Sequence, residues 1–295
     1  FSRFQRLDFG LTWHNISYDI LDRVINTFTG QEELLKRPGS IKFTTVLPTM
    51  SWVIDNSVFG ITGPVDGYRQ NASVTASPGW KNNFSFQTMK FDARKYWRVG
   101  RDYTFALRGF FGRSQGNKAQ KFFLGGTPYL LTDFQSGETN GVKDPSIYRS
   151  VLTDTANSNI ITDVYFTEYA FPMRGARFAE RIGTNAALFN FEIRFPFINY
   201  LALGFPLKLV LGNIRGHAFM DVGAAWDNYS EFSSNMWPDK YGPNNSGNFS
   251  PWVVTSGLGV KINLGYFLLR LESAWDKNPS GYSKPQWYLS LGPDW

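Results

Sequence analysis

The sequence has no cysteine and only two histidines, His14 and His217, among its 295 residues. Without thiols, disulfide scaffolds, thiolate zinc sites and thiol catalysis are excluded. A metal centre would have to rely on carboxylates, and the acidic residues of the predicted loops lack the glycine-punctuated spacing of a calcium loop. No serine lies in a nucleophile elbow. We therefore expect a protein that is not an enzyme and that holds no metal or other cofactor.

Long apolar runs are also missing. No stretch of about 18 or more apolar residues occurs, which excludes a transmembrane helix. The first ten residues, FSRFQRLDFG, lack the apolar core of a signal peptide. Membrane insertion, if it occurs, therefore has to use strands.

Charged residues make up only 18% of the chain, with a net charge of +6. The lysines and arginines are scattered singly, with no basic helix and no nucleic-acid-binding motif, so we expect no nucleic-acid partner. A basic surface of this kind suits anionic lipid or lipopolysaccharide.

Aromatic residues are abundant instead: 27 Phe, 14 Tyr and 10 Trp account for 17% of the sequence. A water-soluble core does not need so many rings. Tyrosine and tryptophan have an apolar body and a polar tip, and they gather at the two lipid–water boundaries of membrane barrels. The composition therefore favours a membrane β-barrel.

Apolar and polar residues alternate in many segments. In residues 101–112, one face would carry Tyr103, Phe105, Leu107, Gly109 and Phe111, and the other Thr104, Ala106 and Arg108. Such segments match the ~9–11 residues that a tilted strand needs to cross a bilayer. The alternation predicts roughly ten strands, near 4–20, 40–54, 66–77, 83–97, 101–114, 184–197, 207–226, 251–264, 266–276 and 285–295.

The predicted fold is all-β: a transmembrane antiparallel β-barrel in one domain, residues 1–295. Residues 30–39, GQEELLKRPG, predict at most two turns of helix, ended by the proline. The first residues already resemble the inside of a strand, and an open sheet edge cannot face lipid. We therefore expect the domain to be a fragment, with further strands and a soluble domain upstream.

Six motifs give the chain a family resemblance. In order they are KFFLGG (121–126), FPMRGARF (171–178), ALFNFEIRFPF (187–197), GHAFMDVGAAWD (216–227), SGLGVKINLGYFLLRLESAW (256–275) and the final WYLSLGPDW. Their order and spacing resemble the C-terminal β-barrel of the BamA-type outer-membrane assembly factors, the bacterial surface antigen superfamily. The expanded segment from 127 to 170 resembles the variant that follows a soluble propeller-like domain.

The resemblance implies a location, a strand count and a function. The protein would lie in the bacterial outer membrane, and its ten strands would belong to a barrel of about sixteen. It would insert or translocate polypeptides at that membrane, in contact with lipid, lipopolysaccharide and client or partner envelope proteins. The alternative is a passive barrel that anchors a soluble domain or serves as a structural subunit of a large envelope complex.

The resemblance also implies a site. Gly125 and Gly126 would form the base of a long loop folded into the barrel lumen, and Arg174 would anchor that loop. The implied partner of Arg174 is Asp221, with Glu192 as a second candidate. A guanidinium is always charged and can donate two parallel hydrogen bonds to one carboxylate. Gly175 would allow the tight turn beside Arg174. The alternative is that Arg174 caps a solvated loop.

The C-terminus carries the last candidate signal. Barrels of bacterial outer membranes tend to end in an aromatic residue within an alternating last strand that the assembly machinery reads. Here the apolar positions are Trp287, Leu289, Leu291 and Trp295. Interfacial anchoring by the same rings is the alternative.

Overall fold

We describe the fold from a computed structural model. It describes residues 3–18, 21–25, 32–36, 41–79, 85–128, 130–135, 167–170, 172–176, 180–204, 209–232, 251–265, 267–278, 281–282 and 284–292.

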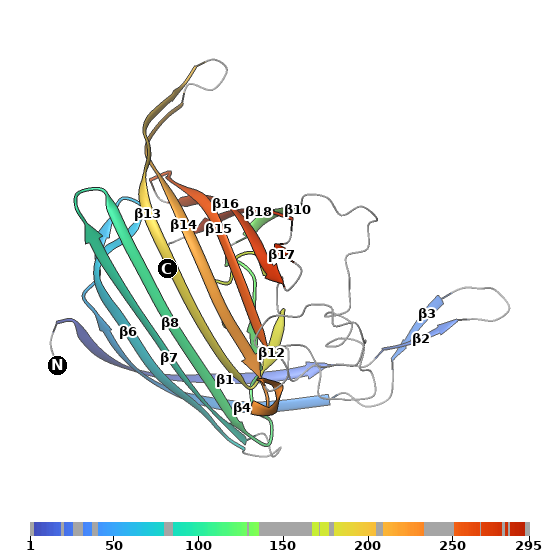
Figure 1. The fold of residues 1–295 in the computed structure, drawn as a ribbon. Coiled ribbons are helices and arrows are strands. Elements are labelled where there is room, and N and C mark those ends of the chain that lie inside the picture. The colour runs from blue at the N-terminus through green and yellow to red at the C-terminus, as the bar shows by residue number, and fades with distance from the viewer. Residues whose placement is uncertain are drawn as a thin grey trace.

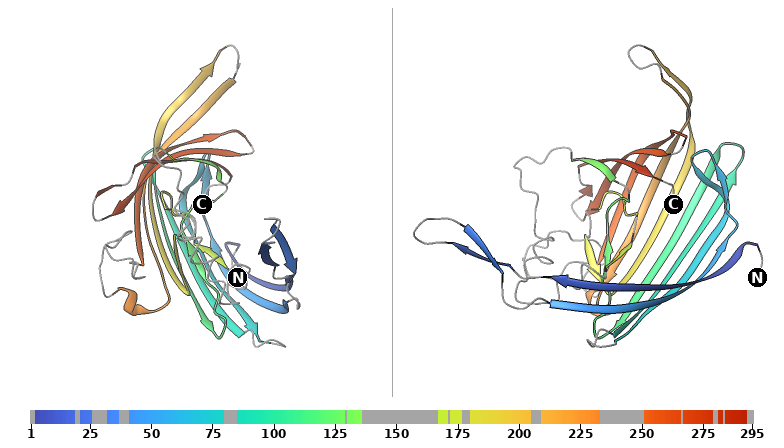
Figure 2. Two further views of the ribbon diagram at one scale, coloured as in Figure 1. Left: turned by 90° about the vertical axis from the view of Figure 1, so that its right-hand side faces the viewer. Right: turned by 180° about the vertical axis from the view of Figure 1, so that it is seen from behind.

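One large antiparallel sheet makes up most of the chain (Figure 1). Its long strands follow one another in chain order, each pairing with the next: β1 (Gln5–Tyr18), β4 (Ile41–Asp55), β6 (Gly63–Pro78), β7 (Ser85–Val99), β8 (Tyr103–Gly116), β13 (Asn185–Leu203), β14 (Leu209–Trp226), β15 (Trp252–Asn263), β16 (Leu268–Asn278) and β18 (Gln286–Gly292). These ten strands are those that the alternation predicts. The sheet is tilted and strongly curved, as Figure 2 shows from the side and from behind. It forms a barrel wall.

The wall is open in the described part of the chain. Its strand order begins at β1 and ends at β10 (Leu130–Gln135), and these two strands are not paired with each other. Two short strands join it at the side, β5 (Val58–Gly60) on β6 and β17 (Gly281–Tyr282) on β16. A single 3-10 turn, η1 (Tyr229–Phe232), follows β14.

The two faces of the wall differ as the alternation predicts. On β8, Thr104 and Arg108 are buried on the inner face, whereas Tyr103 and Phe111 are 51% and 42% exposed on the outer face. A face of exposed aromatic and aliphatic side chains is what hydrocarbon accepts, and a polar inner face is typical of a barrel lumen.

The helix predicted over 30–39 is wrong. The described part of this segment is a strand, β3 (Glu32–Lys36), which pairs antiparallel with β2 (Leu21–Ile25). The run Glu-Glu-Leu-Leu-Lys favours a helix locally, but pairing with a neighbouring strand overrides weak local propensity. Among the described residues, no helix is long and apolar enough to cross a membrane.

A second, smaller sheet lies against the inner wall. It consists of β9 (Phe122–Leu124), with β11 (Glu168–Ala170) parallel on one side and β12 (Arg181–Gly183) antiparallel on the other. All three strands belong to the long segment between β8 and β13. We call these strands, together with residues 172–176, the plug. The described parts of this segment therefore fold back against the inner wall, as expected for a loop inside the lumen.

Apolar packing joins the plug to the wall. Buried plug residues and inner residues of β13, β14 and β15 form one cluster: Phe122, Leu124, Ala170, Met173, Ala176, Ala186, Leu188, Ala225 and Val253. A glycine provides space for this contact. A Cβ atom on Gly223 of β14 would lie 2.8 Å from the sulfur of Met173 and 3.0 Å from the methyl groups of Leu124.

We expect Gly223→Val to push the plug away from the wall. Overpacking at such a contact costs ~1–3 kcal/mol. The measurement is urea unfolding of the protein in lipid vesicles. Gly109→Val on β8 is the matched control, because a Cβ atom there meets nothing within 4 Å. Equal unfolding midpoints for the two variants would contradict the packing described here.

Candidate functional site

The centre of the candidate site is a tight turn, residues 172–176, held against the inner wall. Met173 exchanges two backbone hydrogen bonds with Gly126: its amide donates at 2.9 Å and its carbonyl accepts at 3.2 Å. Gly125 and Gly126 have φ values of 120° and 101°, which an L side chain rarely adopts. The two predicted loop-base glycines therefore lie directly beside the turn that presents Arg174.

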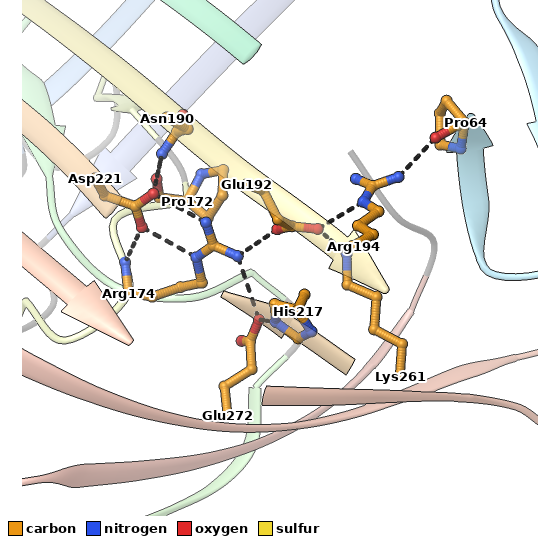
Figure 3. Close-up of polar contacts among 10 residues, drawn as sticks. All are labelled: Pro64, Pro172, Arg174, Asn190, Glu192, Arg194, His217, Asp221, Lys261 and Glu272. Carbon is orange, nitrogen blue, oxygen red and sulfur yellow. Dashed lines mark hydrogen bonds and ion pairs between the residues drawn. The ribbon is translucent and has the colours of Figure 1, made fainter. Parts of the chain in front are cut away.

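The guanidinium of Arg174 forks onto Asp221 of β14 (Figure 3). Nε donates to one carboxylate oxygen at 3.0 Å and Nη2 to the other at 2.9 Å. The backbone amide of Arg174 also donates to Asp221, at 3.0 Å. Arg174 is 2% exposed and Asp221 is fully buried. This bidentate, desolvated geometry is the strongest that an arginine and a carboxylate form.

Glu192 of β13 accepts from the third guanidinium nitrogen of Arg174, Nη1, at 2.7 Å. The structure therefore brings together the three charged residues that the resemblance implies. A solvated loop position, the alternative for Arg174, does not agree with its burial.

A third carboxylate, Glu272 of β16, lies at the same guanidinium and was missed by the sequence analysis. Its Oε1 atom lies 3.4 Å from Nη1 of Arg174. The same oxygen is hydrogen-bonded to Nε2 of His217 at 2.9 Å. The signal that points to it is the alternation of β16, which places Glu272 on the polar inner face with Arg270. Three strands of the wall, β13, β14 and β16, thus each contribute one carboxylate, and His217 of β14 is hydrogen-bonded to the one from β16.

Two uncharged side chains complete the surroundings of Arg174. The guanidinium lies over the ring of Phe219 at 3.6 Å from its centroid, a cation–π contact. Asn190 donates from its amide nitrogen both to Asp221 and to the carbonyl of Pro172, each at 2.8 Å. Asn190 therefore connects the wall carboxylate with the backbone of the plug.

Glu192 extends the network along the inner wall. One of its oxygens accepts from Arg194 at 2.7 Å and from Lys261 of β15 at 2.5 Å. Arg194 in turn donates to the carbonyl of Pro64, at the start of β6, at 2.7 Å. The charges balance, with three cations and three carboxylates: Arg174, Arg194, Lys261, Asp221, Glu192 and Glu272. We call these six residues the lumen network.

Gly175 follows Arg174 with a φ of 86°. A Cβ atom there would lie 2.9 Å from the Cβ of Ala274 and 3.3 Å from that of Thr255. Both the backbone angle and the lack of space require glycine, so the turn approaches β15 and β16 closely enough for Arg174 to reach all three carboxylates.

A second ion pair holds the plug outside the membrane-spanning strands. Lys121, just before β9, donates to both oxygens of Asp227 at 2.8 and 2.9 Å, and the amide of Thr184 donates to Asp227 at 2.8 Å. Burial opposes ionisation of Asp227, but the hydrogen bond and charge of Lys121 outweigh it and lower its pKa. A lowered pKa stabilises the fold at neutral pH, and this contribution is lost only as the pH falls through the folded-state value.

The arrangement is suited to holding the plug against the wall. The acidic residues of the lumen network face cations, and among the described residues no group of three or more histidine, aspartate or glutamate side chains is placed to hold a metal ion. What it can do is fix the plug to three strands of the wall at once.

Comparison with known proteins identifies the family. The sequence profile described as the Omp85 superfamily domain matches residues 3–295. The chain belongs to the Omp85 superfamily. The expected location in the bacterial outer membrane and the expected non-enzymatic role agree with this family. No curated protein matches the sequence.

Solved structures that resemble this chain include those of BamA and CdiB. BamA from Haemophilus ducreyi, in a form lacking POTRA domains 1–3, matches with a TM-score of 0.53 and 13% identity over 98% of this chain and 52% of its own. CdiB from Escherichia coli matches with a TM-score of 0.42 and 11% identity over 97% and 46%. The Omp85 chain described here thus spans about half the length of these proteins. At such identities, the BamA likeness supports the barrel fold alone.

The predicted C-terminal signal of this Omp85 chain lies on β18. Trp287 is 41% exposed, and Leu289 and Leu291 are half-buried at alternate positions of the same strand. They share the outer face of the wall, apart from the lumen network. Trp295 lies outside the described residues. The role of these residues as an assembly signal stays a prediction.

Proposed function

We propose that this chain is the membrane barrel of an Omp85 protein that inserts polypeptides into, or translocates them across, the bacterial outer membrane. The observation that carries the proposal is the family membership over residues 3–295 together with the buried fork of Arg174 on Asp221 in the lumen. The partners are client envelope proteins. Outer-membrane lipid and lipopolysaccharide surround the apolar outer face.

In this proposal Arg174 is a latch that keeps the plug inside the barrel. A charge inside a barrel wall is stable only when it is paired, and removing one partner of a buried pair costs ~3–5 kcal/mol. The pair of Arg174 with Asp221 is more deeply buried than the other ion pairs described between the plug and the wall, Lys121–Asp227 and Lys90–Glu168, so we expect it to contribute most to holding the plug.

The mechanism would be non-covalent, because the lumen network has no nucleophile paired with a base. Incoming strands would pair with the edge of the last wall strand, by the β-augmentation that exposed strand edges favour. Within the described residues, β18 has seven residues against 19 in β13, so in this part of the chain it offers fewer hydrogen bonds to its neighbour. A short strand is the easiest one to separate from its partner.

Depletion of this protein from cells distinguishes the proposed insertion or translocation function from a passive role as an anchor or structural subunit. We expect other outer-membrane barrel proteins to be lost from the membrane fraction when this protein is depleted, measured by quantitative proteomics of washed outer membranes. Re-expression of the intact protein is the control and should restore them. If every other barrel assembles normally and a co-purified envelope complex falls apart instead, the protein is an anchor or structural subunit.

Three further expectations belong to the proposal, and the described residues do not test them. They are the soluble propeller-like domain upstream, the completion of the barrel to about sixteen strands, and the interpretation of residues 1–295 as a fragment of the full protein.

A further inference from the structure

Four side chains with polar groups lie together on the outer face of the wall: Tyr68 and Gln70 of β6, and Lys95 and Trp97 of β7. We call them the outer polar cluster. Lys95 pairs with Tyr68 on one side and with Leu107 of β8 on the other. Directly paired residues point to the same face of a sheet, as do residues two apart along one strand. Leu107 alternates in phase with Tyr103 and Phe111, the exposed outer residues of β8, so the whole cluster faces lipid.

The cluster contains one cation and no carboxylate. The Lys95 ammonium lies 5.7 Å from the ring centroids of both Tyr68 and Trp97, within the range of a cation–π contact. Among the described residues, Lys95 forms no ion pair, and the side chains of Tyr68 and Gln70 have no hydrogen-bond partner. The described wall therefore presents a positive charge and hydrogen-bond donors to the lipid, without a carboxylate to match them.

The cluster lies toward the rim of the wall that carries the short turns. β7 ends at Val99, four residues beyond Lys95, and only residues 100–102 connect it to β8. The opposite rim carries the long segments 19–40 and 117–184. In outer-membrane barrels the short turns face the periplasm. Lys95 therefore lies in the periplasmic leaflet, where the lipids are phospholipids and not lipopolysaccharide.

A lipid-facing lysine at this depth needs an anion from the membrane. A charge on the lipid face of a barrel is unfavourable, and its cost falls toward the interface. Trp97 is 42% exposed, the position of an interfacial aromatic residue. Two residues along a tilted strand place Lys95 only ~5 Å deeper than Trp97. The apolar stem of lysine spans such a distance, so its ammonium reaches the headgroups. The anion at that level is the lipid phosphate.

We propose that the outer polar cluster binds the phosphate of an anionic phospholipid in the periplasmic leaflet. Lys95 balances the charge, and the Tyr68 hydroxyl and the Gln70 amide donate hydrogen bonds to the phosphate oxygens. An anionic lipid such as phosphatidylglycerol fits better than a zwitterionic one, because the cation of a zwitterionic headgroup is repelled by Lys95. The inference requires the barrel to lie in the membrane, and it holds whether or not the protein inserts or translocates clients.

Native mass spectrometry of the full-length protein tests this site. The protein is purified in mild detergent, stripped of lipid and given equal amounts of phosphatidylglycerol, phosphatidylcholine or diacylglycerol, which lacks the phosphate. We expect phosphatidylglycerol to be retained severalfold more than either of the others. Lys95→Met should lose this preference, whereas Lys95→Arg should keep it, because the cation is preserved. Tyr68→Phe removes one donor and should weaken retention less than Lys95→Met.

Arg113→Gln is the matched control. Arg113 lies on the same outer face, paired with Met89, but toward the opposite rim. Its loss should leave the retention of phosphatidylglycerol unchanged. Folding of every variant is checked by the mobility difference between unheated and boiled samples on gels. Equal retention of phosphatidylglycerol by the native chain and by folded Lys95→Met would overturn the site. Displacement of phosphatidylglycerol from Lys95 by an equal amount of lipopolysaccharide would overturn the assignment to a phospholipid.

Discussion

Arg174→Ala is expected to destabilise the plug by ~3–5 kcal/mol, because it leaves buried carboxylates without the cation that they share. Asp221 loses its bidentate partner and Glu192 loses one of three donors. The cation–π contact with Phe219 is lost as well. The measurement is urea unfolding in lipid vesicles, followed by tryptophan fluorescence, with the free energies taken from the transition midpoints and slopes.

The matched control for this variant is Arg215→Ala. Arg215 lies 3.9 Å from Asp102 in a pair whose side chains are 24% and 49% exposed. Exposed ion pairs contribute ~0–1 kcal/mol. A loss at Arg174 no larger than that at Arg215 would mean that the buried fork does not hold the plug.

Glu192→Ala is the second change with a large expected effect. Glu192 is the only residue of the lumen network that contacts three cations, Arg174, Arg194 and Lys261. Removing it leaves three cations facing two carboxylates in a space shielded from water. We expect a loss of ~3–5 kcal/mol in the same unfolding measurement.

Two variants separate charge from packing at Glu192. Glu192→Gln keeps the size of the side chain and removes its charge, so we expect a loss close to that of the alanine variant. Glu168→Ala removes a carboxylate that pairs with a single cation, Lys90, at 2.9 Å where both side chains are more than a quarter exposed. It should cost ~1 kcal/mol or less. Full stability of Glu192→Gln would show that the network does not depend on charge.

The wall of the barrel is the part of the fold that the sequence predicts best. On β8 and β16, alternation separates lipid-facing from lumen-facing side chains, because each strand meets hydrocarbon on one face and polar groups on the other. That separation recurs on β13 and β15 and needs no knowledge of distant partners. The segment 32–36 was mistaken for helix because its partner β2 could not be seen in its own residues.

The site was predictable only in part. The resemblance supplies Arg174, Asp221 and Glu192, and the alternation of β16 places Glu272 on the correct face. Neither indicates that Glu272 reaches the guanidinium of Arg174 or that His217 is hydrogen-bonded to Glu272, since that depends on the curvature of the wall. The pairing of β10 with β18 cannot be predicted from the local sequence either, because backbone hydrogen bonds between distant segments do not require particular residue types.

The most direct test of the latch is a double-mutant cycle between Arg174 and Asp221. The free energy of unfolding is measured under the same conditions for both single alanine variants and for the double variant. The coupling energy is the difference between the loss in the double variant and the sum of the two single losses. If the fork holds the plug in the lumen, the double variant loses much less than the sum of the single losses, by ~0.5–3 kcal/mol. Strictly additive losses would contradict the latch.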